Sequence, residues 1–300
     1  MVYSPEVGFA PGDLWSKIQR QTRHALDYGA LQPIDTRYEF VEQGGMRFLV
    51  RILANLVRKE KADLAQRASG AAGKPFNPFL PYDPDLFVAD LSTTHLCLLN
   101  KYNVVDHHIL IITRAFEDQD TWLTLADFEA LATAMAEIDG LAFYNGGRRA
   151  GASQRHKHLQ LVPPPLCPDR SPLPLDTIVT TLAPSLGRPV SSPLLPFRHA
   201  ILPLDAESGP QGDTMLSTYR SLLEHLGAKW EQSPQTLPYN LLVTRTWMMA
   251  VARQQESYQS IPVNSLGFAG SLLVKDPAQL ALLKSMGPMT VLKHVACSEF

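Results

Sequence analysis

The sequence predicts an α+β fold whose sheet is largely antiparallel and flanked by helices. Two observations lead to this prediction. Short runs of β-branched residues are interspersed with segments of helical periodicity, and several neighbouring runs are separated only by short turns, which join antiparallel strands. The 300 residues are 45% hydrophobic and 19% charged, which is the balance of a folded globular chain rather than a disordered one.

Three segments carry helix signals. The clearest begins at a capping box formed by Thr124 and Asp127, continues with apolar residues at helical spacing and stops at Gly140. A similar apolar stripe ends at Gly227, and a further helix is expected over residues 13–28. Strands are predicted at residues 95–99, 109–113, 141–144, 159–162, 239–244 and 247–252, the last two as a hairpin.

Proline divides the chain. Ten of the 24 prolines fall within residues 163–196, and proline removes amide donors and fixes φ, so this stretch is expected to cross the surface as extended chain. We predict an N-terminal lobe over residues 1–165, a proline-rich connection over 166–195 and a C-terminal lobe over 196–300. Both lobes contain segments that resemble β-hairpins, but no clean sequence repeat relates them.

Charge and cysteine content exclude several classes of protein. The formal net charge of −2 gives no global attraction to nucleic acid or to anionic membranes, and neither is expected as a partner. No apolar run reaches the roughly 20 residues of a membrane span, and the N-terminus carries no secretory signal, so a cytoplasmic protein is expected. The three cysteines are isolated, which argues against a disulfide scaffold and against a cysteine-rich zinc site.

The residues most typical of chemistry lie near one predicted strand. His156, His158 and Gln160 alternate, so on a strand their side chains emerge from one face. Lys157 would lie on the opposite face, near the exposed end of the strand. Histidines at this spacing are also common as metal ligands or as solvated polar residues, so the alternation alone leaves those readings open.

A glycine-rich loop precedes that strand. Gly146, Gly147 and Gly151 allow backbone amides to approach an anion closely, and Ser153 and Gln154 follow. Imidazole is a good nucleophile at neutral pH, and its phosphoramidate adduct is reactive enough to pass the group on. Imidazoles beside an amide-rich loop therefore favour nucleophilic attack on phosphorus.

The segment resembles the active-site strand of the histidine-triad superfamily, with Gln160 in place of the third histidine. Gly151-Ala-Ser-Gln154 and His156-Lys-His-x-Gln160 resemble the diadenosine tetraphosphate phosphorylase (ATP adenylyltransferase) family more than the galactose-1-phosphate uridylyltransferases, which carry Ser-Asn-Pro-His-Pro-His. Further similar segments are 77–80, 99–105, 116–119, 239–248 and 263–275, so the resemblance covers most of the chain. It implies a histidine-triad-like sheet with a second, C-terminal lobe.

The resemblance also implies a mechanism. His158 would attack an α-phosphorus of diadenosine tetraphosphate to give an adenylyl-histidine and ATP, and inorganic phosphate would then take the AMP to give ADP. Gln160 would bind the transferred phosphoryl group, and His156 would orient His158 or contact the phosphate chain. Ser153 and Gln154 would hold the leaving phosphate, and Asn145, Gly151 and Ala152 would line the same site.

Other candidates have stronger structural alternatives. The resemblance implies substrate contacts for Asn100, Lys101, Lys59, Asn264 and Lys275, although an exposed lysine or a tight turn is the simpler interpretation of each. Mg²⁺ or Mn²⁺ is expected to accompany the polyphosphate, but no carboxylate cluster identifies a metal site in the protein. The implied partners are small molecules: diadenosine tetraphosphate, ATP, ADP and inorganic phosphate.

Two other functions remain as alternatives. A uridylyltransferase acting on a hexose phosphate is disfavoured by two features. The residues of the histidine segment differ from Ser-Asn-Pro-His-Pro-His, and the N-terminal half lacks paired cysteines. A nucleotide sensor without turnover would have no need of a nucleophile.

Overall fold

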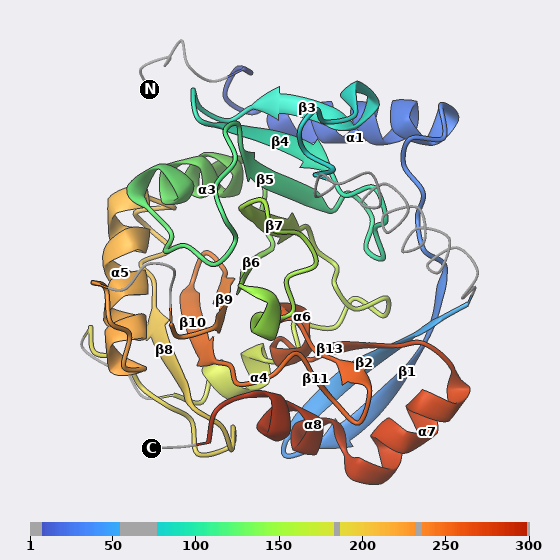
Figure 1. Cartoon of the computed structure of the whole chain (residues 1–300), viewed down its shortest axis with the longest axis vertical. Coiled ribbons are helices and arrows are strands. Elements are labelled where there is room, and N and C mark those ends of the chain that lie inside the picture. Colours follow the sequence, from blue (N-terminus) through green and yellow to red (C-terminus); the bar gives the residue numbers. More distant parts are fainter. Residues whose placement is uncertain (1–7, 55–76, 183–186, 232–235, 299–300) are drawn as a thin grey trace.

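A computed structural model describes residues 8–54, 77–182, 187–231 and 236–298 (Figure 1). Its main sheet has eight strands in the order β3-β4-β5-β7-β6-β9-β10-β8, and every neighbouring pair in it is antiparallel. The strands are β3 (Phe87–Asp90), β4 (His95–Leu99), β5 (Ile109–Thr113), β6 (Leu141–Gly146), β7 (His158–Val162), β8 (His199–Pro203), β9 (Tyr239–Val243) and β10 (Trp247–Ala252). The predicted α+β class and all six predicted strands are confirmed.

Helices cover one face of this sheet. They are α1 (Leu14–Asp27), α3 (Leu125–Glu137) and α5 (Gly212–His225), which agree with the three predicted helices. Their apolar sides pack with alternate strand residues into one core cluster. The predicted capping box at the start of α3 is present, because the Asp127 carboxylate accepts the Thr124 amide at 2.7 Å and the Thr124 hydroxyl accepts the Asp127 amide.

A second, smaller sheet packs on the other face, and the sequence analysis did not predict it. It contains β1 (Thr36–Gln43), β2 (Met46–Leu53) and β13 (Ser271–Val274), and β13 runs parallel to β2. The remaining elements are η1 (Pro84–Leu86), η2 (Arg148–Ala150), α4 (Asp176–Val179), β11 (Ser257–Tyr258), β12 (Ile261–Pro262), α6 (Ser265–Phe268), α7 (Pro277–Met286) and α8 (Pro288–Val295). Strands from the beginning and the end of the chain thus share one sheet.

The proline-rich stretch is not extended throughout, which corrects the expectation from the sequence. It contains the one-turn helix α4, because Leu175 and Ile178 bury their side chains in the core on this face of the main sheet. The strands that follow it continue the main sheet, with β9 paired to β6. In the described ranges, no helix has both the length and the apolar character needed to cross a membrane.

Candidate active site

The structure places the histidine row at the start of β7, in the middle of the main sheet. His158 pairs with Ile112 of β5, and Gln160 pairs with Leu110 of β5 and Phe143 of β6. His156 lies just before the strand and forms an isolated bridge with Asp118. His158 and Gln160 are two residues apart in one strand, so their side chains share a face.

The hydrogen bonds of His158 fix its tautomer. Its Nδ1 lies 2.8 Å from the His156 carbonyl oxygen, which can only accept, so Nδ1 carries the proton. The lone pair of the ring therefore lies on Nε2, which no described residue engages by a hydrogen bond. Burial lowers the pKa of His158 to about 4, so the imidazole is neutral at neutral pH. The ring is thus an uncharged imidazole whose Nε2 lone pair is available.

His156 is held from both sides. Its Nε2 donates to the Thr113 carbonyl at 2.8 Å, and its Nδ1 accepts from Asn77 Nδ2 at 3.0 Å. Asn77 is oriented in turn, because its Oδ1 accepts the Phe79 amide at 3.0 Å. Burial also lowers the pKa of His156. His156 is therefore a fixed, neutral support whose carbonyl positions the ring of His158.

An apolar surface adjoins the histidines. Five buried side chains form a separate small cluster: Phe79, Leu96, Leu98, Leu110 and Ile112. The Phe79 ring centroid lies 5.5 Å from that of His158 and 5.6 Å from that of His156. A neutral imidazole thus lies beside an apolar surface.

His108 is a third buried imidazole near this face. Asn100 Oδ1 accepts the Tyr102 amide at 3.4 Å, so Asn100 Nδ2 donates to His108 Nδ1 at 3.1 Å and His108 carries its proton on Nε2. Among the described residues, that Nε2 has no hydrogen-bond partner of good geometry. Burial lowers the pKa of His108 to about 4, while the nearby Gln160 side chain has a smaller, opposite effect. Asn100 thus orients a histidine beside Gln160.

The glycine loop packs against the C-terminal part of the chain. Gly151 has a φ of +91°, and a Cβ there would lie 2.7 Å from the Val263 carbonyl oxygen. Asn264 follows Val263, and its Oδ1 accepts the Leu266 amide at 3.1 Å to cap α6. The structure therefore brings Gly151 and Asn264 together, although they lie 113 positions apart in the sequence.

Asn145 joins the glycine loop to the second half of the chain. Its Oδ1 accepts from Asn240 Nδ2 at 2.8 Å and from the Ser265 amide at 2.9 Å, and its side chain is buried. Arg253 lies beneath, where it donates to Asn240 Oδ1 and to the Ala150 carbonyl. Burial lowers the pKa of Arg253 to about 9. The side-chain oxygen of Asn145 is thus engaged in hydrogen bonds that hold the loop. A substrate contact through its amide nitrogen stays a prediction.

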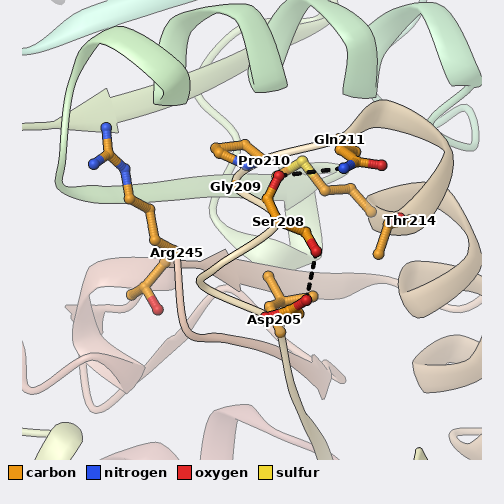
Figure 2. A pocket seen from close by; sticks show the side chains of 10 residues that line it. Asp205, Ser208, Gly209, Pro210, Gln211, Thr214 and Arg245 are labelled. Carbon is orange, nitrogen blue, oxygen red and sulfur yellow. Dashed lines mark hydrogen bonds between the residues drawn. The ribbon is translucent and has the colours of Figure 1, made fainter.

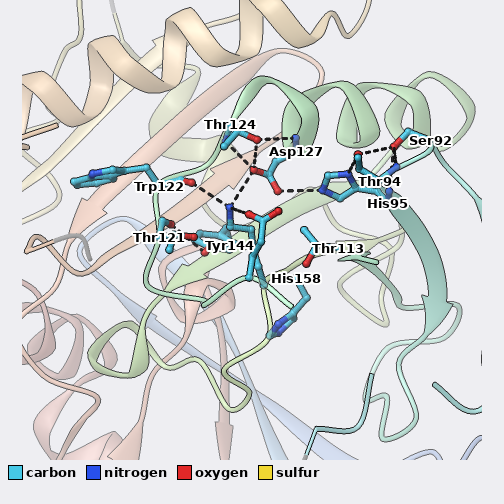
Figure 3. A network of polar contacts seen from close by, with 12 residues as sticks. Ser92, Thr94, His95, Thr113, Thr121, Trp122, Thr124, Asp127, Tyr144 and His158 are labelled. Atoms are coloured by element: carbon cyan, nitrogen blue, oxygen red, sulfur yellow. Dashed lines mark hydrogen bonds and ion pairs between the residues drawn. The ribbon is translucent and has the colours of Figure 1, made fainter. Parts of the chain in front are cut away.

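The expectation for Lys157 is right about its face and wrong about its exposure. Instead of lying at an exposed strand end, its side chain is 1% exposed and forms ion pairs with Glu117 at 2.6 Å and Asp127 at 3.3 Å. Burial opposes ionisation of Asp127, but the hydrogen bond from His95 and the charge of Lys157 hold its pKa below the usual value. Figure 3 shows this network around Asp127, with His158 pointing away from it. Lys157 can be buried because two carboxylates and the Trp122 carbonyl satisfy its ammonium group.

The other predicted residues are spread more widely. Ala152, Ser153 and Gln154 lie in the loop between Gly151 and the histidines, with Ser153 exposed and the others half-buried. Two lysines face carboxylates: Lys101 Nζ lies 3.8 Å from Asp83, and Lys275 Nζ lies 3.9 Å from Asp276 at the end of β13. In the described ranges, Lys275 forms no hydrogen bond or ion pair with the histidine row. Lys59 lies outside the described residues.

Two cavities lie away from the histidines. One, of about 190 Å³, is lined by the turn at residues 204–211 and by Arg245 (Figure 2). The Arg245 guanidinium points away from it and donates to the carbonyls of Met135 and Ala136 at the end of α3. The other, of about 440 Å³, is lined by residues 191–199. Within the described part of the chain, no group of three His, Cys, Asp or Glu side chains could hold a metal ion.

Comparisons with known proteins find two matching family domains. Residues 4–181 match the family of the Ap4A phosphorylase N-terminal domain, and residues 193–298 match the family of the ATP adenylyltransferase C-terminal domain. Diadenosine 5′,5‴-P1,P4-tetraphosphate phosphorylase 2 of Saccharomyces cerevisiae is 30% identical over 235 residues, which are 69% of this chain and 71% of that protein. Protein APA1 of the same yeast is 26% identical over 292 residues, or 89% of this chain and 88% of that protein.

A solved structure has the same fold. The crystal structure of yeast Ap4A phosphorylase Apa2 in complex with Ap4A superposes with a TM-score of 0.80 at 24% identity, and the match covers 97% of this chain and 100% of that one. The family matches together span both the histidine row and the segment packed on the glycine loop. The chain therefore belongs to the Ap4A phosphorylase family.

Proposed function

We propose that this protein catalyses the reversible phosphorolysis of diadenosine tetraphosphate (Ap4A) to ATP and ADP through an adenylyl group carried on His158. The observation that supports it most directly is the state of that imidazole. Its Nδ1–H is bound to the His156 carbonyl at 2.8 Å, which leaves the Nε2 lone pair for attack. Family membership supplies the substrate class.

In the first step, His158 Nε2 attacks an α-phosphorus of Ap4A. An N–P bond forms, the bond from that phosphorus to its bridging oxygen breaks, and ATP leaves with the electron pair. In the second step, an oxygen of inorganic phosphate attacks the same phosphorus, the N–P bond breaks, and ADP leaves. The His156 carbonyl keeps its hydrogen bond to Nδ1 throughout and stabilises the positive charge on the adenylylated ring.

The residues around His158 would divide the remaining work. Gln160 lies on the same face and would donate its amide to the transferred phosphoryl group. Ser153 and Gln154 would hold the leaving phosphates, together with amides of the glycine loop that ends at Gly151. The apolar cluster that contains Phe79 would receive the adenine.

Gln160 is also better suited to a reaction in which phosphate, rather than water, accepts the adenylyl group. Its amide does not ionise and so cannot remove a proton from an attacking water molecule. Phosphate is already anionic and needs less help from a base. We include Mg²⁺ or Mn²⁺ in the proposal as an ion carried by the polyphosphate oxygens. A cytoplasmic location, where ATP and ADP are abundant, is also part of it, and cell fractionation would test that location.

The function is tested by product analysis. The purified protein is incubated with Ap4A and Mg²⁺, with and without inorganic phosphate, and the nucleotides are separated. We expect ATP and ADP to form only when phosphate is present. Formation of ATP and AMP without phosphate would make the protein a hydrolase and would overturn the argument from Gln160. If neither tube shows turnover, the proposal fails and UDP-hexose with a hexose phosphate is the next substrate pair.

A further inference from the structure

The ladder between β6 and β7 stops just short of the proposed nucleophile. Its pairs are Leu141 with Val162, Ala142 with Leu161 and Phe143 with Gln160, and no pair follows. Continued in register, the ladder would bring His158 opposite Asn145. The strands separate there. His158 still pairs with Ile112 of β5 and Asn145 with Asn240 of β9, but the backbone groups that face the gap have no partner on the opposite strand. In a buried region this is costly unless something replaces the ladder.

The side chain of Gln119 fills this gap. Its Oε1 accepts the His158 amide at 2.8 Å, and its Nε2 donates to the Asn145 carbonyl at 3.0 Å and to the His158 carbonyl at 3.2 Å. A primary amide offers the same donor and acceptor as a peptide unit, so one side chain stands in for the missing strand contact. Gln119 is 2% exposed, and water therefore does not compete strongly for these bonds.

Gln119 is itself held at both ends of its backbone. Its amide donates to the Arg155 carbonyl at 2.6 Å, and its carbonyl accepts the Tyr144 hydroxyl at 2.6 Å. The Lys157 amide donates to the Glu117 carbonyl at 2.8 Å, so the loop that carries Gln119 pairs with the chain on both sides of His156. The amide of Gln119 is therefore fixed before it meets His158.

We propose that Gln119 is a positioning residue that sets the direction of the His158 Nε2 lone pair. The inference rests on the proposed function, because it concerns the approach of that nitrogen to phosphorus. The His158 ring is fixed at two places. Gln119 holds its backbone N–H and C=O, and the His156 carbonyl holds Nδ1. Without Gln119, the backbone groups of His158 that face β6 lose these hydrogen bonds, and the ring is held less precisely even though His158 still pairs with Ile112 of β5.

Replacing Gln119 by glutamate tests the proposal with minimal change in shape. The carboxylate keeps an acceptor for the His158 amide but loses both donors and places negative charge against two carbonyl oxygens. Gln43→Glu is the matched control. Gln43 lies at the end of β1 in the smaller sheet, and its Oε1 accepts the Met289 amide at 2.8 Å, a bond that glutamate preserves.

For Gln119→Glu, we expect kcat to fall by about 100-fold while KM for Ap4A changes by less than about threefold, because binding is kept and alignment is lost. Gln43→Glu should keep the wild-type kcat. The defect should shrink from about pH 8 to about pH 5.5, since protonation of the introduced carboxyl restores one donor. A purely structural role would lower the melting temperature and leave kcat per folded molecule and its pH profile unchanged, and that result would overturn the proposal.

Two further measurements keep the test decisive. If Gln119→Glu does not fold, Gln119→Met removes the polar contacts at similar volume, and the same fall in kcat is expected. In the wild-type protein, the backbone amide of His158 should exchange with solvent as slowly as ladder amides, and fast exchange would contradict the proposed bond. Wild-type protein without Ap4A phosphorolysis would refute the proposed function instead, whereas active wild type with an equally active Gln119→Glu variant would refute only the role of Gln119.

Discussion

Two units of the main sheet have the same organisation, and only one carries the histidine row. The first unit runs β5-α3-β6-β7 with strand order β5-β7-β6, and the second runs β8-α5-β9-β10 with strand order β8-β10-β9 (Figure 1). They meet where β6 pairs with β9, and Asn145 lies opposite Asn240. Each asparagine follows a buried tyrosine, Tyr144 or Tyr239, so the units are related as two copies of one strand–helix–hairpin plan.

The difference lies in the last strand of each unit. β7 begins with His158 and exposes part of Gln160, whereas all six residues of β10 are buried and apolar. The second unit has a similar histidine on another strand, His199 of β8, whose Nδ1 lies 2.7 Å from the Phe197 carbonyl. There the Ser192 amide donates to Nε2 at 2.8 Å. A buried imidazole with a bound Nδ1 is therefore not enough, because the reactive nitrogen must also be left unused.

The largest difference between the two units is expected when His158 and His199 are each replaced by alanine. His158→Ala is expected to lower the rate of ATP release in a single turnover by about 10⁴-fold or more, since it removes the nucleophile. His199→Ala should keep kcat within about twofold of wild type but cost about 2 kcal/mol of stability, because it leaves the Ser192 amide and the Phe197 carbonyl unpaired.

Both effects can be measured on the same preparations. Mass spectrometry after an alkaline quench, which preserves the acid-labile phosphoramidate bond, detects the adenylyl adduct, and urea unfolding gives the stability. An adduct on the His158→Ala protein would show that the nucleophile lies elsewhere. A large fall in kcat for His199→Ala would show that the second unit takes part in chemistry.

Lowering the pH should affect the first unit in particular. Burial lowers the pKa of three histidines that lie in or beside it, which are His108, His156 and His158. The pKa of His158 is about 4, so its adenylylation rate should stay level from neutral pH to about pH 5 and fall about tenfold per pH unit below about pH 4. An ordinary histidine would already lose activity near pH 6.5. A single-turnover pH profile with a midpoint near pH 6.5 would contradict the lowered pKa.

The same histidines make stability depend on pH. The unfolded chain protonates His158 and His108 near pH 6.5, whereas the folded chain does so only near about pH 4. Between these values the unfolded state binds more protons, so the free energy of unfolding falls as the pH is lowered through that interval. Urea unfolding at several pH values measures this loss.

The smallest effect should come from the two tyrosines at the junction. The Tyr144 hydroxyl donates to the Gln119 carbonyl at 2.6 Å, and the Tyr239 hydroxyl lies 2.7 Å from that of Tyr219. Phenylalanine at either position should cost about 1 kcal/mol of stability. Only Tyr144→Phe should also slow kcat, by about threefold, because it loosens the loop that positions His158. Equal kcat values for the two variants would show that the tyrosines are equivalent.

Local patterns predicted every strand and helix of these two units except β8, because apolar spacing and end signals depend on near neighbours. They also predicted the shared face of His158 and Gln160. The parallel pairing of β13 with β2 was missed because more than 200 residues separate them, from Leu53 to Ser271, and such pairing leaves no local pattern. The hairpin of β1 and β2, with Gly44-Gly45 as its turn, does carry a local signal, and the sequence analysis overlooked it. The relation between the units was missed because little more than the Tyr-Asn pair is repeated in sequence.

The burial of Lys157 was not predictable, since its partners Glu117 and Asp127 come from a loop and a helix that only the fold brings together. Phe116–Gln119 resembled the family in sequence, but no role could be given to Gln119 from that pattern. Its amide matters only because β6 and β7 separate at His158, and strand separation leaves no recognisable pattern in the sequence.

The parallel pairing of β2 with β13 has a consequence for biosynthesis. During translation, β2 leaves the ribosome long before β13 exists, so one edge of an apolar strand, with Leu49 and Val50 at its centre, waits unpaired until almost the whole chain has been made. Open apolar edges are sites of mispairing between nascent chains. The N-terminal segment therefore cannot complete its fold while the chain is still being made. A chain terminated shortly before residue 271 would lack β13 and would also leave β2 without its parallel partner.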